Sequence, residues 1–600
     1  MKGSNRWPPI FALGLTAVLV FLVLPNPLRV PQNNPAAQAE FAPVPGKREQ
    51  SSASANFGET NQASSEGIGS GGDSGIGGPP PPPPPTDFIY KPSNKNCVGD
   101  PPRQTEDPLS PPCVPFFDGD NKGSTWRGVT GDTIKVVLYN DLNVEGDMTK
   151  PWKVSDEQAD HETSQNGQQT YLVRTIKGLL SFFTQRYQTY GRRVELIAVP
   201  SQNGLTSTCS QRATDATTVN RKHQPFAVVH FGDGGQCFLT EMAEKYQVPG
   251  FGLNADVPRK LFEDVRPYTW GFFPDQETEA SYSASFICRK LFGRKAKFAN
   301  SPTLQELTRK FGLIFPTKSQ RGPESAELAD LLMRFMQQDK ACAGIKIGKG
   351  RENDVVVRTI ANDGKAEASG IMTDFVSFNV TTIICYCVPV QTENTVTTMQ
   401  TTAQGLNYYP EWYWDHASRM FRAIWNELFN NDAMSSFGTS YHWRNDSFKE
   451  QYWYRAYLTQ WPGTIPNTRF GFDIYHLFLN LYQGLQGAGP QLTPESVERG
   501  MFTFNYLDRT NFFGPIGGYG PYDRNAVSSY TFIDTGMAFY WDPTGTPPGE
   551  NNPKGCLRAV RDGRRYYAGE WPEGDDDLFQ PSSPCYQDDT KILKSGPGDF

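Results

Sequence analysis

From residue 132 to about residue 390, short apolar runs alternate with longer stretches whose apolar residues recur at helical spacing. The run DTIKVVLYND (132–141) is typical of a buried strand, and residues 167–191 are typical of an amphipathic helix. Further strands are expected at 192–200, 225–232, 310–317 and 381–390, and further helices at 210–222, 239–247, 278–292 and 323–339. Such alternation predicts βαβ units and parallel sheets. The pattern restarts after Trp270, which predicts two α/β lobes, each with a parallel sheet flanked by helices.

The N-terminus has the features of an export signal. Lys2 and Arg6 precede an apolar run at 10–24, which is shorter than the roughly 20 residues that a membrane span requires. A small-residue pattern, Ala37-Gln38-Ala39, follows at some distance. Two interpretations fit this segment, a cleaved signal peptide and an uncleaved anchor. Both predict an exported protein, secreted or membrane-tethered, at the cell surface or in another extracytoplasmic compartment.

Residues 25–95 are rich in Pro, Gly, Ser, Ala and Asn and contain seven consecutive prolines at 79–85. This composition buries too little apolar surface to offset the entropy of ordering, so the segment is expected to be disordered. The proline run predicts a stiff rod of roughly 22 Å, at about 3.1 Å per residue. We interpret the segment as a tether that holds a folded domain away from a membrane. The alternative is a disordered leader that has no function of its own.

Several functional classes are not supported by the sequence. The net charge is −7, so no basic field favours a nucleic-acid partner. The chain has no HExxH, GxSxG or phosphate-binding Gly-Lys motif. Cys385 and Cys387 are too close together for the usual zinc spacing. The sequence therefore predicts a binding protein with no catalytic residues, no metal and no cofactor.

A glycine-rich loop, GDGGQ (232–236), lies between an expected strand and an expected helix. Ligands of open α/β sheets bind where the carboxyl ends of strands lead into helices. Glycines there let backbone N–H groups and a helix N-terminus approach a small polar or anionic group. This loop is a candidate ligand contact; the alternative is that its glycines serve only a tight turn.

The order of these features, over roughly residues 128–543, resembles the type I periplasmic binding proteins, specifically the branched-chain amino-acid-binding group of ABC-transporter substrate-binding proteins. The resemblance lies in GVTGDTIKVVLYND (128–141), GRRVELIAVPSQNGLTSTCS (191–210), AEKYQVPGFGLNADVP (243–258), RPYTWGFFPDQETEASYSASF (266–286), GFDIYHLFLNLYQGLQGAG (471–489) and GPIGGYGPYDRNAVSSYTFIDTG (514–536). It implies a two-lobed fold in which the lobes close over a small polar ligand, amino-acid-like, peptide or carboxylate, and deliver it to an ABC permease at the membrane.

The resemblance also indicates ligand-binding positions. In the first lobe these are Asp233, Gly234, Gly235, Gln236, Leu253 and Asn254, and in the second lobe Arg321 and Glu411. The hydroxyl residues with which the family grips an α-amino acid are largely missing, because Phe238 and Leu239 follow the cysteine at 237. This departure argues against a free leucine-like ligand and favours an alternative, a tethered ligand-sensing or protein-interaction module with a degenerate cleft.

Two further features bear on the ligand. Arg321 has the geometry to clamp a carboxylate or phosphate, unless it is a solvated surface arginine. The aromatic residues of 408–414 either stack on a ligand or, more often for such clusters, fill a core.

An even count of ten cysteines in an exported chain favours disulfides. Members of the family often bridge the loops after the second and third strands, which corresponds here to Cys209–Cys237. The other candidate pairs are Cys97–Cys113, Cys556–Cys585 and Cys288–Cys342, with Cys385 and Cys387 competing for the partners of the last pair.

The expected organisation therefore has five parts. They are a signal peptide or anchor (1–24), the tether (25–95), a disulfide-stapled lead-in (96–127), the bilobed domain (128–543) and an acidic C-terminal extension (544–600). Lobe 1 is expected at about 128–270 plus 465–515, and lobe 2 at about 275–460 plus 516–543.

Overall fold

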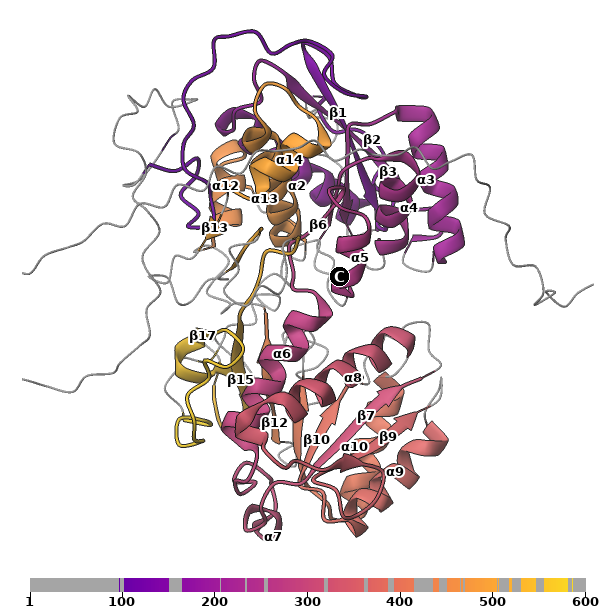
Figure 1. Ribbon diagram of the computed structural model, residues 1–600, viewed down its shortest axis with the longest axis vertical. Coiled ribbons are helices and arrows are strands. Elements are labelled where there is room, and N and C mark those ends of the chain that lie inside the picture. The colour runs from indigo at the N-terminus through magenta and orange to yellow at the C-terminus, as the bar shows by residue number, and fades with distance from the viewer. Residues whose placement is uncertain are drawn as a thin grey trace, which may run out of the picture. The chain divides into compact units, whose positions relative to one another are not determined.

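The computed structural model describes Cys97, residues 102–580 with internal gaps, and Cys585 (Figure 1). The gaps are residues 151–164, 205–206, 232–234, 253–256, 318–321, 361–364, 387–392, 415–434, 442–450, 465, 468–469, 504, 507–516, 521–529, 547–554 and 581–584. The predicted signal or anchor and the predicted tether lie outside the described residues. Among the helices that the structure describes, none has both the length and the apolar character needed to cross a bilayer.

The sheet of lobe 1 has the strand order β2–β3–β1–β4–β5–β6. Its strands are β1 (Thr133–Asn140), β2 (Gly146–Asp147), β3 (Arg193–Pro200), β4 (Ala227–Phe231), β5 (Gly250–Gly252) and β6 (Thr269–Gly271). All neighbouring pairs are parallel except β2–β3. The strands expected at 132–141, 192–200 and 225–232 therefore form, within a residue or two at each end.

Alternate residues of β1 pack on opposite faces of this sheet. Val136 and Leu138 belong to a core that includes residues of α2 (Gln165–Arg186) and α13 (Gly471–Ala488). Val137 and Tyr139 belong to a core formed with α3 (Cys209–His223) and α4 (Gln236–Tyr246), which lie side by side in Figure 1. Burial on both faces explains why this strand is an uninterrupted apolar run in the sequence.

The sheet of lobe 2 has the order β16–β15–β12–β11–β10–β7–β9–β8, with β17 paired to β15. The strands from β8 to β12 are parallel, and β15, β16 and β17 are antiparallel additions. The strands are β7 (Phe311–Pro316), β8 (Ile347–Gly348), β9 (Val355–Ile360), β10 (Thr382–Cys385), β11 (Glu411–Trp414), β12 (Ser435–Ser440), β15 (Gly536–Asp542), β16 (Cys556–Ala559) and β17 (Arg565–Tyr566). The main helices of this lobe are α6 (Gln276–Phe286), α8 (Gly322–Gln338), α9 (Lys365–Ser377) and α10 (Glu393–Gly405).

The two sheets share one topology. In lobe 1 the parallel strands follow the order β3–β1–β4–β5–β6, and in lobe 2, apart from the two-residue edge strand β8, they follow the order β9–β7–β10–β11–β12. Each order places the first strand of the lobe between its second and its third. This is the order 2-1-3-4-5 of a doubly wound α/β fold. The predicted fold class, two α/β lobes with parallel sheets flanked by helices, is confirmed.

In the part of the chain that the structure describes, three crossover segments connect the lobes. The first crossover runs from β6 into α6, the second leaves β12 at Tyr441, and the third is residues 530–535, which lead into β15. The second crossover leads to α12 (Tyr452–Gln460), whose Trp453 and Tyr457 belong to the core of lobe 1. This helix packs against α2, whereas the sequence pattern places the end of the second-lobe segment at about residue 460.

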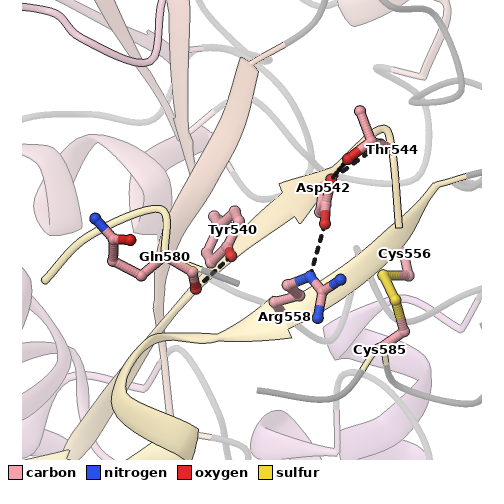
Figure 2. Close-up of a disulfide and its surroundings, with 7 residues drawn as sticks. All are labelled: Tyr540, Asp542, Thr544, Cys556, Arg558, Gln580 and Cys585. Atoms are coloured by element: carbon pink, nitrogen blue, oxygen red, sulfur yellow. Dashed lines mark hydrogen bonds and ion pairs between the residues drawn. A yellow bond between two sulfur atoms is a disulfide. The ribbon is translucent and has the colours of Figure 1, made fainter. Parts of the chain in front are cut away.

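The C-terminal extension continues the sheet of lobe 2. After β15, the chain forms β16 and then β17, and both pair antiparallel with β15. Figure 2 shows how side chains secure this arrangement: Arg558 Nε donates to Asp542 Oδ2 over 2.7 Å, and the Tyr540 hydroxyl donates to the Gln580 carbonyl over 2.6 Å. The extension is thus an integral part of lobe 2.

Four of the expected disulfides are present. They are Cys97–Cys113, Cys209–Cys237, Cys288–Cys342 and Cys556–Cys585. Cys385, which competed for the partners of the third pair, is also disulfide-bonded. The Cys209–Cys237 bridge spans 28 positions of sequence and is worth roughly 3–4 kcal/mol by the chain-entropy estimate. It joins the start of α3 to the first turn of α4.

The lead-in packs onto lobe 1 through buried polar contacts. The Leu109 carbonyl accepts a 2.9 Å hydrogen bond from Gln483 Nε2 of α13, and Asp107, which is 3% exposed, accepts a 2.8 Å bond from the Leu109 N–H. Burial raises the pKa of Asp107 to about 6, against smaller opposing effects of that hydrogen bond and nearby groups. A carboxyl group with such a pKa makes the packing of the lead-in sensitive to pH.

We expect stability to fall as the pH rises from about 4 to about 6. The pKa of Asp107 in the folded state lies above its ordinary value of 3.8. The protonated carboxyl therefore stabilises the fold fully below pH 3.8, and this stabilisation is lost as the carboxyl ionises at higher pH. The difference corresponds to about 3 kcal/mol at neutral pH. Asp107→Asn is therefore expected to raise the urea midpoint at pH 7.5 and to flatten its change between pH 4 and 7.5. Asp120→Asn, at an exposed position of the same lead-in, is the control. An unchanged pH profile in Asp107→Asn would contradict the prediction.

Candidate functional site

Polar residues gather where the central strands of lobe 1 end. Asp141 directly follows β1, Ser201 directly follows β3, and His230 lies one residue before the end of β4. Arg212 reaches them from α3. We call these four residues the Asp141 cluster. They lie at the carboxyl edge of the sheet, around the point where the order of the strands reverses.

The Asp141 carboxylate is the centre of the cluster. Arg212 binds it with two nitrogens, NH1 to Oδ1 over 2.8 Å and NH2 to Oδ2 over 3.2 Å. The Ser201 hydroxyl donates to Oδ1 over 2.7 Å. The Arg212 and Asp141 side chains are 2% and 0% exposed. This bidentate geometry holds the guanidinium in one orientation.

His230 completes the cluster from the strand that leads into the glycine-rich loop. Its Nε2 lies 3.6 Å from Asp141 Oδ2, a distance longer than a hydrogen bond. Burial by itself raises the pKa of Asp141, but His230 and Arg212 outweigh this effect and hold it below the ordinary value. The carboxylate is therefore ionised at neutral pH and is compensated by the guanidinium.

A second buried carboxylate, Asp215, lies on α3 next to the Asp141 cluster. It accepts hydrogen bonds from the Tyr139 hydroxyl over 2.7 Å and from the Gln202 N–H over 3.2 Å. The Tyr139 ring stacks on Phe238 of α4 with centroids 3.8 Å apart. These contacts fix α3 and α4 against the ends of β1 and β3, so this edge of lobe 1 is built from fixed polar groups.

Gly235 lies directly against the Asp141 cluster. A Cβ atom at this position would lie 2.0 Å from His230 Nδ1, so any larger residue would displace the imidazole. Gly235 is the N-cap of α4 and provides no side-chain cap for the helix. The first-turn N–H groups of a helix carry partial positive charge and attract anionic groups. The close approach explains why this position has a glycine.

The structure describes three of the eight residues that the sequence predicts as ligand contacts. Gly235 and Gln236 lie together at the start of α4, beside the Asp141 cluster. Asp233, Gly234, Leu253, Asn254 and Arg321 lie outside the described residues. The third described residue, Glu411, lies elsewhere.

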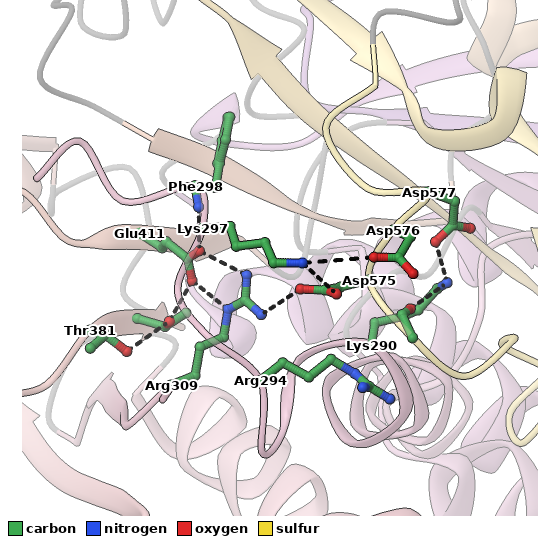
Figure 3. Close-up of polar contacts among 12 residues, drawn as sticks. Lys290, Arg294, Lys297, Phe298, Arg309, Thr381, Glu411, Asp575, Asp576 and Asp577 are labelled. Atoms are coloured by element: carbon green, nitrogen blue, oxygen red, sulfur yellow. Dashed lines mark hydrogen bonds and ion pairs between the residues drawn. The ribbon is translucent and has the colours of Figure 1, made fainter. Parts of the chain in front are cut away.

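Glu411 is the first residue of β11, at the amino edge of the lobe 2 sheet. Figure 3 shows its carboxylate bound by Arg309, with Nε to Oε2 at 2.8 Å and NH2 to Oε1 at 2.9 Å. The Phe298 N–H and the Thr382 hydroxyl also donate to it, over 3.0 and 2.6 Å. Both side chains of the ion pair are 0% exposed. Because ligand loops gather at the carboxyl edge of such sheets, we do not include Glu411 in the proposed site.

The aromatic stretch at 408–414 fills the core of lobe 2. Trp412 and Trp414 stack on one face of the sheet, with centroids 6.0 Å apart, and Tyr413 packs on the other face. Tyr408 is buried as well. The interpretation as core residues is therefore confirmed for these four aromatics, whereas Tyr409 is half-buried.

Sequence reasoning missed the Asp141 cluster. The available signal was the polar pair Asn140-Asp141 at the end of an otherwise apolar strand. Nothing in the sequence links that pair to Arg212, 71 positions away. In chemical terms the cluster offers fixed charges and dipoles rather than a reactive group. Within the described ranges, no group of three or more His, Cys, Asp or Glu residues is arranged to hold a metal ion.

Comparisons with known proteins bear on the fold. No family model and no curated protein matches the chain. Similar solved structures include an ABC-transporter solute-binding protein from R. palustris in complex with 4-hydroxybenzoate, at 12% identity and a TM-score of 0.44, covering 75% of this chain and 100% of that one. The leucine-binding protein LivK from Thermotoga maritima matches at 12% identity and a TM-score of 0.42, covering 68% and 95%.

A further similar structure is an ABC-transporter substrate-binding protein from Desulfitobacterium hafniense in complex with Leu, at 10% identity and a TM-score of 0.43, covering 73% of this chain and 99% of that one. Two of these structures are ABC-transporter solute- or substrate-binding proteins, the class that the sequence resembles. The ligands named here belong to those proteins.

Proposed function

We propose that this protein is an extracytoplasmic solute-binding protein that captures a small polar ligand between its two lobes and delivers it to an ABC permease. The observation that carries the proposal is the position of the Asp141 cluster and Gly235. They lie at the carboxyl edge of the lobe 1 sheet, where the strand order reverses between β1 and β4. In open α/β sheets this is where ligands bind.

The proposed site contains residues from both lobes. Gly235 and Gln236, at the start of α4, present backbone N–H groups to a carboxylate or another polar group. Asp233, Gly234, Leu253 and Asn254 complete the lobe 1 side, and Arg321 from lobe 2 clamps an anionic group of the ligand. A ligand that contacts both lobes favours their closed arrangement through its higher affinity for that state.

A second candidate function is a tethered ligand-sensing or protein-interaction module on the same fold. It is favoured by the seven prolines at 79–85 and by the apolar residues Phe238 and Leu239, which replace the hydroxyl clamp of the resembling family. Both side chains are buried in the core beside α3, so neither is placed to grip an amino acid. In this case the protein itself presents a surface to a partner, and no permease is needed.

The test is a thermal-shift screen of the chain, expressed under oxidising conditions, against amino acids, short peptides, sugars, nucleosides and carboxylates. A ligand at 100 times its dissociation constant adds about 2.7 kcal/mol of stability and shifts the melting temperature measurably. Arg321→Ala and Asn254→Ala are expected to abolish the shift, whereas Arg221→Ala, at an exposed position of α3, is expected to keep it. A flat screen on well-folded protein would favour the second candidate.

A further inference from the structure

The three crossovers lie against one another. The third crossover forms a parallel bridge to β6 through Gly271 and Thr531. The Phe532 N–H donates to the Gly271 carbonyl over 3.1 Å, and the Ile533 N–H donates to the Phe272 carbonyl over 3.2 Å. The first and third crossovers therefore run side by side at the edge of lobe 1.

Contacts between aromatic rings strengthen the packing of the first and third crossovers and extend it to the second crossover. Phe272 stacks on Phe532 with centroids 5.5 Å apart and an interplanar angle of 6°. Phe273 contacts Tyr441, at the start of the second crossover, with centroids 4.7 Å apart. Any bending between the lobes must occur within this bundle, because no other described segment of the chain continues from one sheet to the other.

An arginine of lobe 1 holds the first crossover. Arg259, on the short helix α5 (Arg259–Asp264), binds Asp275 with Nε at 3.1 Å and NH2 at 3.0 Å. Asp275 is 0% exposed and caps α6 by accepting from the Thr278 N–H over 2.7 Å. The end of the first crossover is therefore fixed to lobe 1.

An arginine of the C-terminal extension holds the other two crossovers. Arg565 lies on β17, opposite Met537 of β15, and is 3% exposed. Its Nε donates to Thr535 Oγ1 over 2.9 Å, and its NH2 donates to the carbonyls of Thr535 and of Tyr441, over 2.5 and 2.7 Å. One guanidinium thus joins the second and third crossovers where they meet the lobe 2 sheet.

We propose that the C-terminal extension is a hinge clamp: Arg565 fixes the lobe 2 ends of two crossovers and thereby restricts the movement of the lobes. The inference rests on the proposed function in one respect, since lobes that close on a ligand must bend at these crossovers. A guanidinium suits this task because its donors form a rigid planar fork. Its burial removes competing water, which strengthens each bond.

The extension is also anchored at points away from the crossovers. Cys556–Cys585 and the Arg558–Asp542 ion pair secure β16 on β15, and β17 follows after one short turn. These contacts lie away from the crossovers. They provide a matched control, because Arg558→Ala removes an ion pair of the extension and leaves the contacts of Arg565 with Thr535 and Tyr441 in place.

The first arm of the test is hydrogen exchange on the ligand-free chain. Losing charge-assisted bonds at Thr535 and Tyr441 is expected to speed exchange of the peptide covering residues 530–536 on the order of tenfold in Arg565→Ala. Arg558→Ala is expected to leave that peptide unchanged. Thr535→Val, which removes only the Oγ1 acceptor, is expected to show a smaller effect in the same direction and replaces Arg565→Ala if the latter does not fold.

The second arm measures the distance between the lobes. Spin labels are introduced through unnatural amino acids at two exposed threonines, Thr218 of α3 and Thr373 of α9, so that all cysteines stay paired. The ligand-free distance distribution is expected to broaden in Arg565→Ala and not in Arg558→Ala. If Arg565→Ala folds and the exchange of residues 530–536 is unchanged, the proposal is overturned. It is also overturned if that exchange is faster but the distribution of distances between the spin labels is unchanged. Both arms use ligand-free protein, so a flat ligand screen bears on the proposed function alone.

Discussion

Replacing Arg212 by methionine, with Asp141 left in place, is expected to lower the free energy of unfolding by about 3–5 kcal/mol. The guanidinium makes two bonds to a carboxylate that is 0% exposed. Its removal leaves Asp141 buried, with the Ser201 hydroxyl and the more distant His230 as its remaining partners among the cluster. Burial of an uncompensated charge is far more costly than the loss of the ion pair itself. Urea unfolding followed by tryptophan fluorescence measures the change.

Two further variants serve as controls for this prediction. Arg221→Ala removes an exposed arginine of the same helix and is expected to change stability little. The double variant Arg212→Met/Asp141→Leu removes both charges and is expected to recover much of the loss, because no buried charge then remains unpaired. If Arg212→Met were as stable as the wild type, the cluster would not be the fixed charged structure described here.

Three strands of lobe 1, β1, β3 and β4, were predictable because both faces of a parallel sheet are buried. The run at 132–141 has no alternative to a buried strand, and β1 occupies residues 133–140. β11 was not recognised, although it is fully buried along its length. Its sequence EWYW, preceded by a proline, has the appearance of an aromatic loop. Burial of its first residue requires the Arg309 partner, which lies 102 positions earlier in the chain.

The candidate site likewise contains features that follow from local sequence and features that depend on tertiary contacts. A glycine such as Gly235 between β4 and α4 was predictable from local rules, because glycine suits tight turns and close backbone approach. The reason that Gly235 in particular is needed is the His230 imidazole beside it, a contact that only the folded chain reveals. The role of Arg565 is equally non-local, since its partners lie 30 and 124 positions away. Local pattern thus locates loops and strands, whereas paired buried charges depend on the tertiary structure.

The second large effect is expected in lobe 2. Arg309→Met is predicted to lower the free energy of unfolding by about 3–5 kcal/mol, because the Glu411 carboxylate then loses its guanidinium while 0% exposed. Asp575 of the C-terminal extension, 3.6 Å from Arg309 NH1, loses a cationic neighbour as well. Lys297, which Figure 3 shows beside Asp575, keeps its Nζ 3.3 Å from the Asp575 carboxylate. The urea midpoint of unfolding measures the loss.

An exposed ion pair of the same lobe tests whether the expected loss of stability comes from the burial of the charge rather than from the loss of an ion pair as such. Lys295 binds Glu306 over 2.5 Å, with 54% and 75% of the two side chains exposed, and Lys295→Ala is expected to leave the midpoint unchanged because water solvates both charges. Arg309→Met/Glu411→Leu is expected to be more stable than Arg309→Met alone. Equal losses in Arg309→Met and Lys295→Ala would contradict the argument. The contrast would also explain why Glu411 is unsuited to ligand binding: a carboxylate whose pairing holds the core of a lobe is not free to exchange its partner for a ligand.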